Sequence, residues 1–274
     1  MLDFFKAVVL GLLQGLTEFL PISSSAHLRI FPELFGWGDP GAAFTAVIQI
    51  GTELAVLIYF RRDIWRIGST WMRSLRDPGL RGHVDSRMGW YIIVGSMPIV
   101  ILGILLKDVI EEDFRNLWII GTTLVVFGVI LGIADRMGGR KRTIRQMTLR
   151  HSVFLGLAQA CALVPGVSRS GGTISMGRLL GYDREAATRF AFLLAIPAVV
   201  GAGLFELKEI PHGDNAYGWG PTIVATVISF VVGYSAIAWL LRYISTNSYL
   251  PFVVYRVLLG GATLVLLGVG TFSP

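Results

Sequence analysis

Two polar stretches in this apolar chain contain the residues whose types and spacing could do chemistry. In the first, Gln14 and Glu18 are four residues apart, so on a helix they share one face. Ser24 and His27 follow the helix-breaking Pro21, and their spacing of three places a hydroxyl nucleophile and a base on one face of a new helix. A carboxylate beside a carboxamide could hold a divalent cation or take up a proton, and the sequence does not separate these roles.

The second stretch, VPGVSRSGGT at residues 164–173, has the composition of a phosphate site. Backbone N–H groups at the start of an apolar helix and one bidentate cation, Arg169, suit a phosphate group. The hydroxyl residues and glycines beside this arginine are Ser168, Ser170, Gly171, Gly172 and Thr173.

Each stretch also has a plainer interpretation. Glu18 could lie at a shallow membrane interface, the serines could only cap a helix, and Arg169 could be one more arginine that flanks a span. Against this, an ionisable group inside a membrane segment is costly and by default functional. Arg169 also lies about 19 residues beyond Arg150, which favours a deep position.

The composition is that of a membrane protein. Of the 274 residues, 53% are hydrophobic and 15% are charged, against roughly 25% charged residues in soluble domains. The single Cys161 excludes an intramolecular disulfide and a cysteine-rich metal site. The net charge of +6 is concentrated in two loops between apolar spans, so we expect membrane lipids and no nucleic acid as partners. Charge-free stretches long enough to cross a bilayer are residues 89–106, 116–134, 215–241 and 257–274.

The placement of arginines predicts the orientation of the spans. Residues 61–88 hold seven arginines and three aspartates, and residues 135–150 hold six basic residues and one acid, so both loops should be cytoplasmic. Residues 107–116 and 206–218 are net acidic, which suits the outside.

Counting from these loops predicts about six transmembrane helices and two stretches that do not cross. Residues 1–42 and 151–189 each begin and end on one side, so we expect two re-entrant helical hairpins that enter from opposite faces. The predicted crossings are residues 43–60, 89–107, 117–134, 190–205, 220–241 and 251–271.

The chain also contains an internal repeat. A fixed offset of 145 residues places residues 11–25 over residues 156–170 and matches Gly, Leu, Gln, Ser and Ser without a gap. Three spans separate the copies, and an odd number inverts the second. We therefore expect an all-α integral membrane protein, one domain of two inverted-topology repeats at approximately 1–134 and 151–271, joined by loop 135–150.

The repeat pairs residues of different chemistry. At the fixed offset Ser24 corresponds to Arg169, His27 to Gly172, and Glu18 to Leu163. In inverted repeats the broken segments of the two halves meet near the bilayer midplane. We expect one half to attack and the other to hold the charge that develops on a phosphoryl group.

The residues at the two tips resemble a known family. QGLTEFLPISSSAH at 14–27 and PGVSRSGGT at 165–173 are similar to the two signature regions of the bacterial undecaprenyl-diphosphate phosphatases of the bacitracin-resistance type. The similarity extends to VIQIGTELAV at 47–56, RFAFLLAIP at 189–197 and PFVVYR at 251–256. It implies an enzyme of the bacterial plasma membrane that removes the terminal phosphate from a C55 polyprenyl diphosphate, which recycles the lipid carrier of cell-wall synthesis and confers bacitracin resistance.

The resemblance also implies roles for single residues. Gln14 and Glu18 fill the family's (E/Q)xxxE positions, and the amide at Gln14 makes direct metal ligation there less favourable. Arg256 matches a further active-site position, although an arginine at the start of the last span could equally be a cytoplasmic anchor. The catalytic residues implied are Ser24, His27, Glu18 and Arg169. Those implied to bind the diphosphate are Ser23, Ser168, Ser170, Gly171, Gly172, Thr173 and Arg256.

These residues predict attack by Ser24 on the terminal phosphorus, with His27 or Glu18 accepting its proton. Direct attack by water stays open as an alternative. We expect a divalent cation, Mg²⁺ or Ca²⁺, near Glu18 and Gln14. The rival function is a secondary transporter or flippase of a polyprenyl phosphate lipid without hydrolysis, because inverted repeats are the usual build of carriers.

Several properties are not fixed by the sequence. The lipid chain length, the metal and the oligomeric state stay open, although a homodimer is compatible with the chain. The side to which the cavity opens does not follow from the spans, and the resemblance favours the extracytoplasmic side. Glu53 in the first span has no assigned role.

Overall fold

The structure is a computed structural model that describes residues 2–38, 40–106, 109, 116–139, 141–209 and 215–272. At residues 42, 202 and 204–209 it describes the backbone alone. The predicted external position of residues 107–116 and 206–218 therefore falls mostly outside the described residues.

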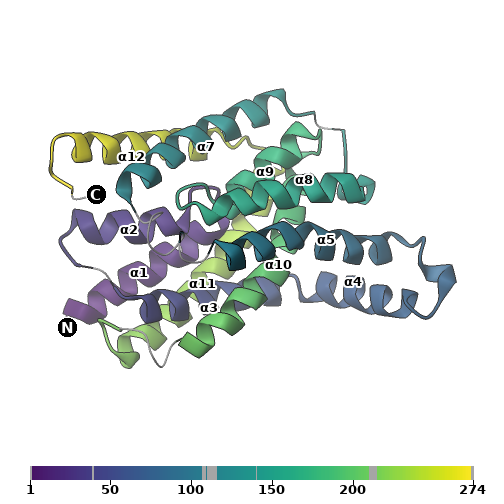
Figure 1. The fold of residues 1–274 in the computed structure, drawn as a ribbon, viewed down its shortest axis with the longest axis horizontal. Coiled ribbons are helices and arrows are strands. Elements are labelled where there is room, and N and C mark those ends of the chain that lie inside the picture. The colour runs from purple at the N-terminus through teal and green to yellow at the C-terminus, as the bar shows by residue number, and fades with distance from the viewer. Residues whose placement is uncertain are drawn as a thin grey trace.

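The described part of the chain folds into α-helices and short 3₁₀ turns and forms no β-strand (Figure 1). The helices are α1 (Leu2–Phe19), α2 (Ser24–Leu34), α3 (Ala42–Tyr59), α4 (Arg61–Ser74), α5 (Val84–Leu105), α7 (Leu117–Met137), α8 (Leu149–Ala160), α9 (Arg169–Leu179), α10 (Arg184–Glu209), α11 (Trp219–Ile244) and α12 (Leu250–Gly268).

Four helices within the described residues, α5, α7, α11 and α12, are long and apolar enough to cross a membrane. A fifth span is counted if α3 and α4, which meet at a bend of 68°, are taken as one. Large apolar side chains such as Leu258 and Val265 are about 65% exposed on these helices, as expected for helices surrounded by lipid. The chain is thus an all-helical, multi-pass membrane protein, as its composition predicts.

One difference from the sequence analysis lies in residues 61–88, which were expected to be a loop. They contain the whole of α4 and the first turn of α5. Charge alone does not prevent helix formation, and α4 separates its polar from its apolar residues as an interfacial helix does. Arg66 on α4 pairs with Asp63 and with Asp85 of α5, which helps to hold the two helices together.

Two helical hairpins meet at the centre of the molecule. The first hairpin consists of α1 and α2, and the second consists of α8 and α9. They enter from opposite ends of the molecule, and their tips meet near its middle (Figure 1). Both α2 and α9 have 11 residues, and their bounds differ by the offset of the sequence repeat.

The packing of the hairpins is also matched. α1 packs against α11, and α8 packs against α5. A Cβ on Gly11 of α1 would overlap the backbone of Ala225, and a Cβ on Gly156 of α8 would overlap the backbone of Gly95. Glycine at these two equivalent positions allows the close helix approach that membrane helices use.

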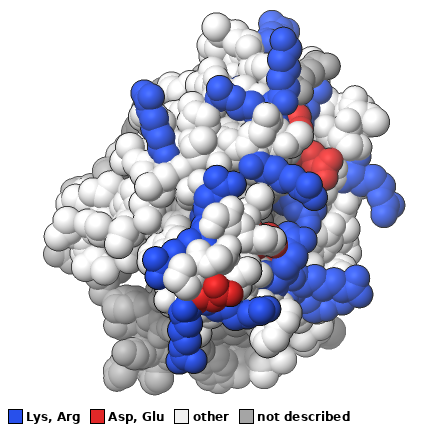
Figure 2. All heavy atoms as spheres, turned by 90° about the vertical axis from the view of Figure 1, so that its right-hand side faces the viewer, with Lys and Arg blue, Asp and Glu red and all other residues white. Residues whose placement is uncertain are grey.

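The basic loops lie together at one end of the molecule, on the right of Figure 1. Seen from that end, Lys and Arg side chains spread over the surface with few acidic residues among them (Figure 2). This agrees with the prediction that both loops face the same compartment.

A buried ionic cluster fixes the second hairpin at this basic end. Arg178 of α9 is fully buried, bonds the Asp135 carboxylate at 3.2 Å and donates to the backbone carbonyls of Gly138 and Gly139. Arg184 at the start of α10 bonds the same carboxylate at 2.7 Å. The base of the second hairpin is therefore tied to the ends of α7 and α10.

Candidate active site

Each hairpin tip is built on a serine in the left-handed backbone region. Ser23 has φ of 73° and Ser168 has φ of 72°, the two positive values among the described non-glycine residues. Each hydroxyl caps the helix that follows, accepting from the amide of Ala26 at 3.4 Å and of Gly171 at 3.1 Å. Strained backbone of this kind persists only where the surrounding structure holds it, and it gathers at functional sites.

The Glu18 carboxylate joins the two tips. Its Oε2 accepts the Ser24 hydroxyl at 2.5 Å and the Gln14 amide at 3.2 Å. Its Oε1 accepts from the Arg169 guanidinium of the second hairpin. The Glu18 side chain is only 9% exposed. A hydroxyl, a carboxylate and a guanidinium therefore lie in one continuous set of hydrogen bonds that crosses between the hairpins.

His27 is fully buried and faces other partners. Its Nδ1 bonds the Ser23 carbonyl at 2.6 Å, and its Nε2 bonds the Tyr255 hydroxyl at 2.6 Å. A carbonyl only accepts, so Nδ1 carries the proton and Nε2 accepts from the tyrosine. The spacing of Ser24 and His27 favoured a serine–histidine pair, but the hydroxyl of Ser24 is bonded to Glu18.

Tyr255 is a site residue that the sequence analysis did not single out. It lies on α12, and its ring is nearly parallel to that of His27, at 6° with centroids 5.5 Å apart. The available signal was its place directly before Arg256 in the PFVVYR stretch.

The second tip repeats the hydroxyl contacts of the first. The hydroxyl oxygens of Ser168 and Ser170 are 3.1 Å apart, and those of Ser23 and Ser25 are the same distance apart. The Ser170 hydroxyl also donates to the carbonyl of Leu20 in the first hairpin at 3.2 Å. These bonds hold the two tips against each other.

The first turn of α9 is closely packed. The Thr173 hydroxyl is buried and donates to the carbonyl of Arg169 at 2.8 Å, and the Gly172 amide donates to the carbonyl of Ser168. A Cβ on Gly171 would lie 2.7 Å from the Arg256 guanidinium. Gly171 is therefore needed to leave room for that guanidinium.

Arg256 is fully buried between the tips. This position fits the active-site interpretation and not that of an exposed anchor at the end of a span. Its Nη1 donates to the carbonyl of Pro21 in the first tip at 3.1 Å, and Nη2 donates to those of Gly166 and Val167 in the second. Nε donates to the carbonyl of Leu124 in α7 at 3.3 Å. Arg256 thus joins the backbones of both tips to α7.

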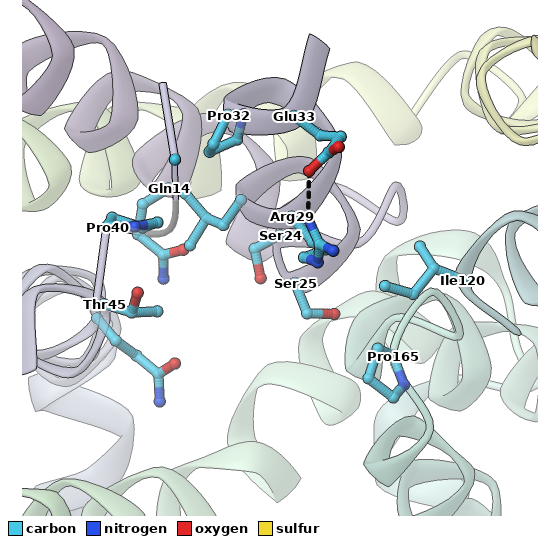
Figure 3. Close-up of a pocket in the computed structure, with 13 residues that line it drawn as sticks. Gln14, Ser24, Ser25, Arg29, Pro32, Glu33, Pro40, Thr45, Ile120 and Pro165 are labelled. Carbon is cyan, nitrogen blue, oxygen red and sulfur yellow. Dashed lines mark hydrogen bonds and ion pairs between the residues drawn. The ribbon is translucent and has the colours of Figure 1, made fainter. Parts of the chain in front are cut away.

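A cavity of about 200 Å³ lies beside the Ser24 hydroxyl (Figure 3). Gln14 and Ser24 line it from the first hairpin, Pro165 from the second, and Gln49 from α3. Because Gln14 and Ser24 both bond Glu18, the cavity reaches the hydrogen-bonded set described above.

Glu53 lies beside this site. It is buried on α3, and its carboxylate accepts from the amide of Gln49, which lines the cavity, at 3.3 Å. Local spacing could not place Glu53, since α3 reaches the site only through tertiary packing.

The candidate metal ligands supply part of a cation site. Within the described residues no group of three or more His, Cys, Asp or Glu side chains could hold a metal ion. Glu18 and Gln14 offer one carboxylate and one amide oxygen. Mg²⁺ is commonly bound by one or two carboxylates together with substrate phosphates, so these two residues fit a site that the substrate completes.

A serine hydroxyl, a carboxylate and a guanidinium between two buried hairpin tips have the chemistry of a membrane-embedded enzyme acting on a phosphate ester or anhydride. Residues 7–262 match the family model described as bacitracin resistance protein BacA, and the chain belongs to this family.

Three relatives illustrate the similarity. The chain is 75% identical over 273 residues to the undecaprenyl-diphosphatase of Nocardioides sp. (strain ATCC BAA-499 / JS614), with 100% of both chains covered. It is 57% identical to the undecaprenyl-diphosphatase of Micrococcus luteus, with 99% of this chain and 100% of the relative covered. It is 56% identical to undecaprenyl-diphosphatase 2 of Streptomyces coelicolor, with 100% and 98% covered. The family resemblance drawn from the two tips is confirmed.

Proposed function

We propose that this chain is an undecaprenyl-diphosphatase, which hydrolyses the terminal phosphate of undecaprenyl diphosphate and returns the monophosphate as a lipid carrier for cell-wall synthesis. Removal of the diphosphate form also confers resistance to bacitracin. The observation that carries the proposal is the position of Glu18 between the Ser24 hydroxyl and the Arg169 guanidinium, in a chain 75% identical over its full length to an undecaprenyl-diphosphatase.

In the first step the Ser24 oxygen attacks the terminal phosphorus. The bond from that phosphorus to the bridging oxygen breaks, Glu18 takes the serine proton, and polyprenyl phosphate leaves. Protonation removes the carboxylate charge that held Arg169. The guanidinium can then stabilise the oxygens of the phosphoryl group, where negative charge has to be neutralised.

In the second step water cleaves the phosphoserine. Glu18 first passes its proton to the departing lipid phosphate, and then takes a proton from the attacking water. The Ser24 oxygen leaves phosphorus and recovers the proton from Glu18, which restores the starting site. His27, with its bonds to the Ser23 carbonyl and the Tyr255 hydroxyl, holds the first turn of α2 in place.

Gln14, and Glu18 while its carboxylate is ionised, are the residues that would hold a divalent cation, Mg²⁺ or Ca²⁺, together with the substrate phosphates. Such a cation supplies positive charge to the phosphate oxygens when it is bound.

The arrangement we propose around the site is an inverted repeat with six crossings, α3, α5, α7, α10, α11 and α12, and two re-entrant hairpins. Its support is the equal length and fixed offset of α2 and α9, the matching φ of Ser23 and Ser168, and the matched glycines at 11 and 156. With the basic loops in the cytoplasm, the two tips come near the bilayer midplane.

We also propose that the cavity opens to the extracytoplasmic side. Pro32 near the end of α2, Pro40 after that helix and Thr45 in the first turn of α3 line the cavity. The first hairpin enters from the end of the molecule opposite the basic loops (Figure 1).

Purified protein in detergent tests the function, with phosphate release from undecaprenyl diphosphate as the measurement. We expect Ser24→Ala to lower kcat by at least ~10³-fold, because the nucleophile is lost, while native protein forms an acid-stable phosphoserine. Exposed Ser245→Ala on the cytoplasmic side is the matched control.

A protein that binds the lipid but releases no phosphate would instead favour the rival transporter or flippase. Undiminished turnover in Ser24→Ala would remove the serine from the mechanism and favour direct attack by water.

A further inference from the structure

The cavity holds an ion pair that the proposed reaction does not use. Arg29 and Glu33 of α2 both line it, together with Ser24 and Ser25 (Figure 3). Ser25, Arg29 and Glu33 are spaced by four residues, so one face of α2 runs from the reactive tip toward the far end of the hairpin. Among the described residues that line this cavity, Arg29 supplies the one positive charge and Glu33 the one negative charge.

We propose that Arg29 is a phosphate-recognition residue of this cavity and that Glu33 competes with the phosphate for its guanidinium. The inference rests on the proposed function, since it assigns Arg29 to the lipid diphosphate or to the phosphate that the reaction releases.

The geometry leaves Arg29 able to bind an anion. Its Nη1 donates to Oε2 of Glu33 at 3.0 Å, and among the described residues this is the one side chain that the guanidinium binds. A guanidinium carries five N–H donors in a planar fork, so most of them stay available. The Arg29 side chain is 31% exposed and can therefore meet a ligand that enters the cavity.

The other arginines of the site show why Arg29 could be needed for phosphate binding. Arg169 is already paired with Glu18, and the guanidinium of Arg256 donates to backbone carbonyls of both tips, so an incoming diphosphate meets few free donors there. The Arg29 guanidinium can bind a phosphate through two parallel hydrogen bonds. To do so, it must release the carboxylate of Glu33. Glu33 also lowers the attraction between product and cavity, because it neutralises Arg29 once the phosphate departs.

An ordinary helix pair makes a different prediction. An exposed arginine and glutamate at this spacing are usually worth a few tenths of a kcal/mol to the helix and nothing to a ligand. In that case removing either partner would leave substrate binding unchanged. If Glu33 competes with phosphate, the two removals must act on binding in opposite directions.

Steady-state phosphate release from undecaprenyl diphosphate in detergent tests the inference. We expect Arg29→Gln to raise KM about tenfold with kcat within about twofold of native. Arg29→Lys should give an intermediate KM, because it keeps the charge and loses the fork. Glu33→Gln should lower KM about threefold. Arg66→Gln, which breaks exposed pairs with Asp63 and Asp85 and does not line the cavity, is the matched control and should leave both constants unchanged.

Inhibition by inorganic phosphate distinguishes the two sources of the anion. A raised KM in Arg29→Gln with an unchanged inhibition constant assigns Arg29 to the lipid headgroup. A raised inhibition constant with an unchanged KM assigns it to the released phosphate. If KM and the inhibition constant are both native in Arg29→Gln, or if Glu33→Gln moves them in the same direction as Arg29→Gln, the inference is overturned.

Calorimetric binding of inorganic pyrophosphate separates this inference from the proposed function. Should the native protein release no phosphate, the function fails, yet weaker pyrophosphate binding in Arg29→Gln and tighter binding in Glu33→Gln would still support the role of Arg29. Equal binding in all three proteins would contradict it.

Discussion

The first and second hairpin tips have closely similar backbones but carry different side chains. Ser23 and Ser168 share a left-handed φ and the same capping contact, and each lies 3.1 Å from a second serine hydroxyl two residues on. Between these serines the first tip carries Ser24 and the second carries Arg169. The shared backbone positions two different groups against one carboxylate, Glu18.

The helices that lead into the tips differ in the same way. Gln14 of α1 bonds the Glu18 carboxylate and the Thr52 hydroxyl. Its counterpart Gln159 in α8 is fully buried, and neither its amide nitrogen nor its oxygen has a described hydrogen-bond partner. At the offset of the repeat Glu18 is replaced by Leu163. The two hairpins can therefore share one scaffold although only the first carries an acid.

The largest expected difference between the halves is at Glu18 and Leu163. Glu18→Gln should lower kcat by ~10²–10⁴-fold, because the hydroxyl of Ser24 loses its proton acceptor. Leu163→Gln changes the equivalent, partly exposed position and should leave kcat within about twofold of native. Phosphate release under substrate saturation measures both. Equal losses in the two variants would contradict the division of labour.

The next effect concerns the arginine between the tips. Arg256→Met should lower kcat by ~10- to 100-fold and the free energy of unfolding by about 3 kcal/mol, since the carbonyls at both tips lose their donor. Arg178→Met removes a cation equally buried at the base of the second hairpin. We expect a similar loss of stability with a smaller loss of kcat. Turnover and the unfolding midpoint in detergent check this, and equal kcat losses would argue against a special role for Arg256.

A smaller effect should be the same at both tips. Ser23→Ala and Ser168→Ala each remove the hydroxyl that caps the following helix, so each should cost about 1–2 kcal/mol. Glycine at either position should recover part of this loss, because it adopts positive φ freely. Thermal unfolding in detergent measures the four variants. A loss at only one tip would show that their backbones are not equivalent.

The smallest effect should have opposite signs in the two halves. Gln159→Leu should raise the free energy of unfolding by up to about 1 kcal/mol, because a buried polar group without a partner is removed. Gln14→Leu should lower the free energy of unfolding, since Glu18 and Thr52 both lose the amide that donates to them. Thermal unfolding of both variants decides the point. A destabilised Gln159→Leu protein would mean that this amide has a partner after all.

Much of this architecture could be predicted from the sequence. Charge-free stretches locate the apolar helices, and the offset of 145 residues locates both tips, because each half must satisfy the same packing rules. The helical form of residues 61–74 was missed, since a charged segment gives no signal of burial but can still be an amphipathic helix.

The contacts within the site could be predicted only in part. The sequence identified Glu18, Ser24 and Arg169, but it could not choose between Glu18 and His27 as the partner of Ser24. That choice depends on the backbone at Ser23, because its carbonyl accepts a hydrogen bond from Nδ1 of His27. Tyr255 and Glu53 lie near the site through long-range packing, which local spacing does not reveal.

We expect Glu18 of the first hairpin and Arg169 of the second to work as a single unit, and a double-mutant cycle measures their coupling. kcat/KM for phosphate release would be measured in native protein, Glu18→Gln, Arg169→Gln and the double variant. We expect the kcat/KM of the double variant, relative to native, to be at least about tenfold higher than the product of the relative values of the two single variants, because either change alone already breaks the unit. Relative values that simply multiply would show that Glu18 and Arg169 act independently and that no such unit exists.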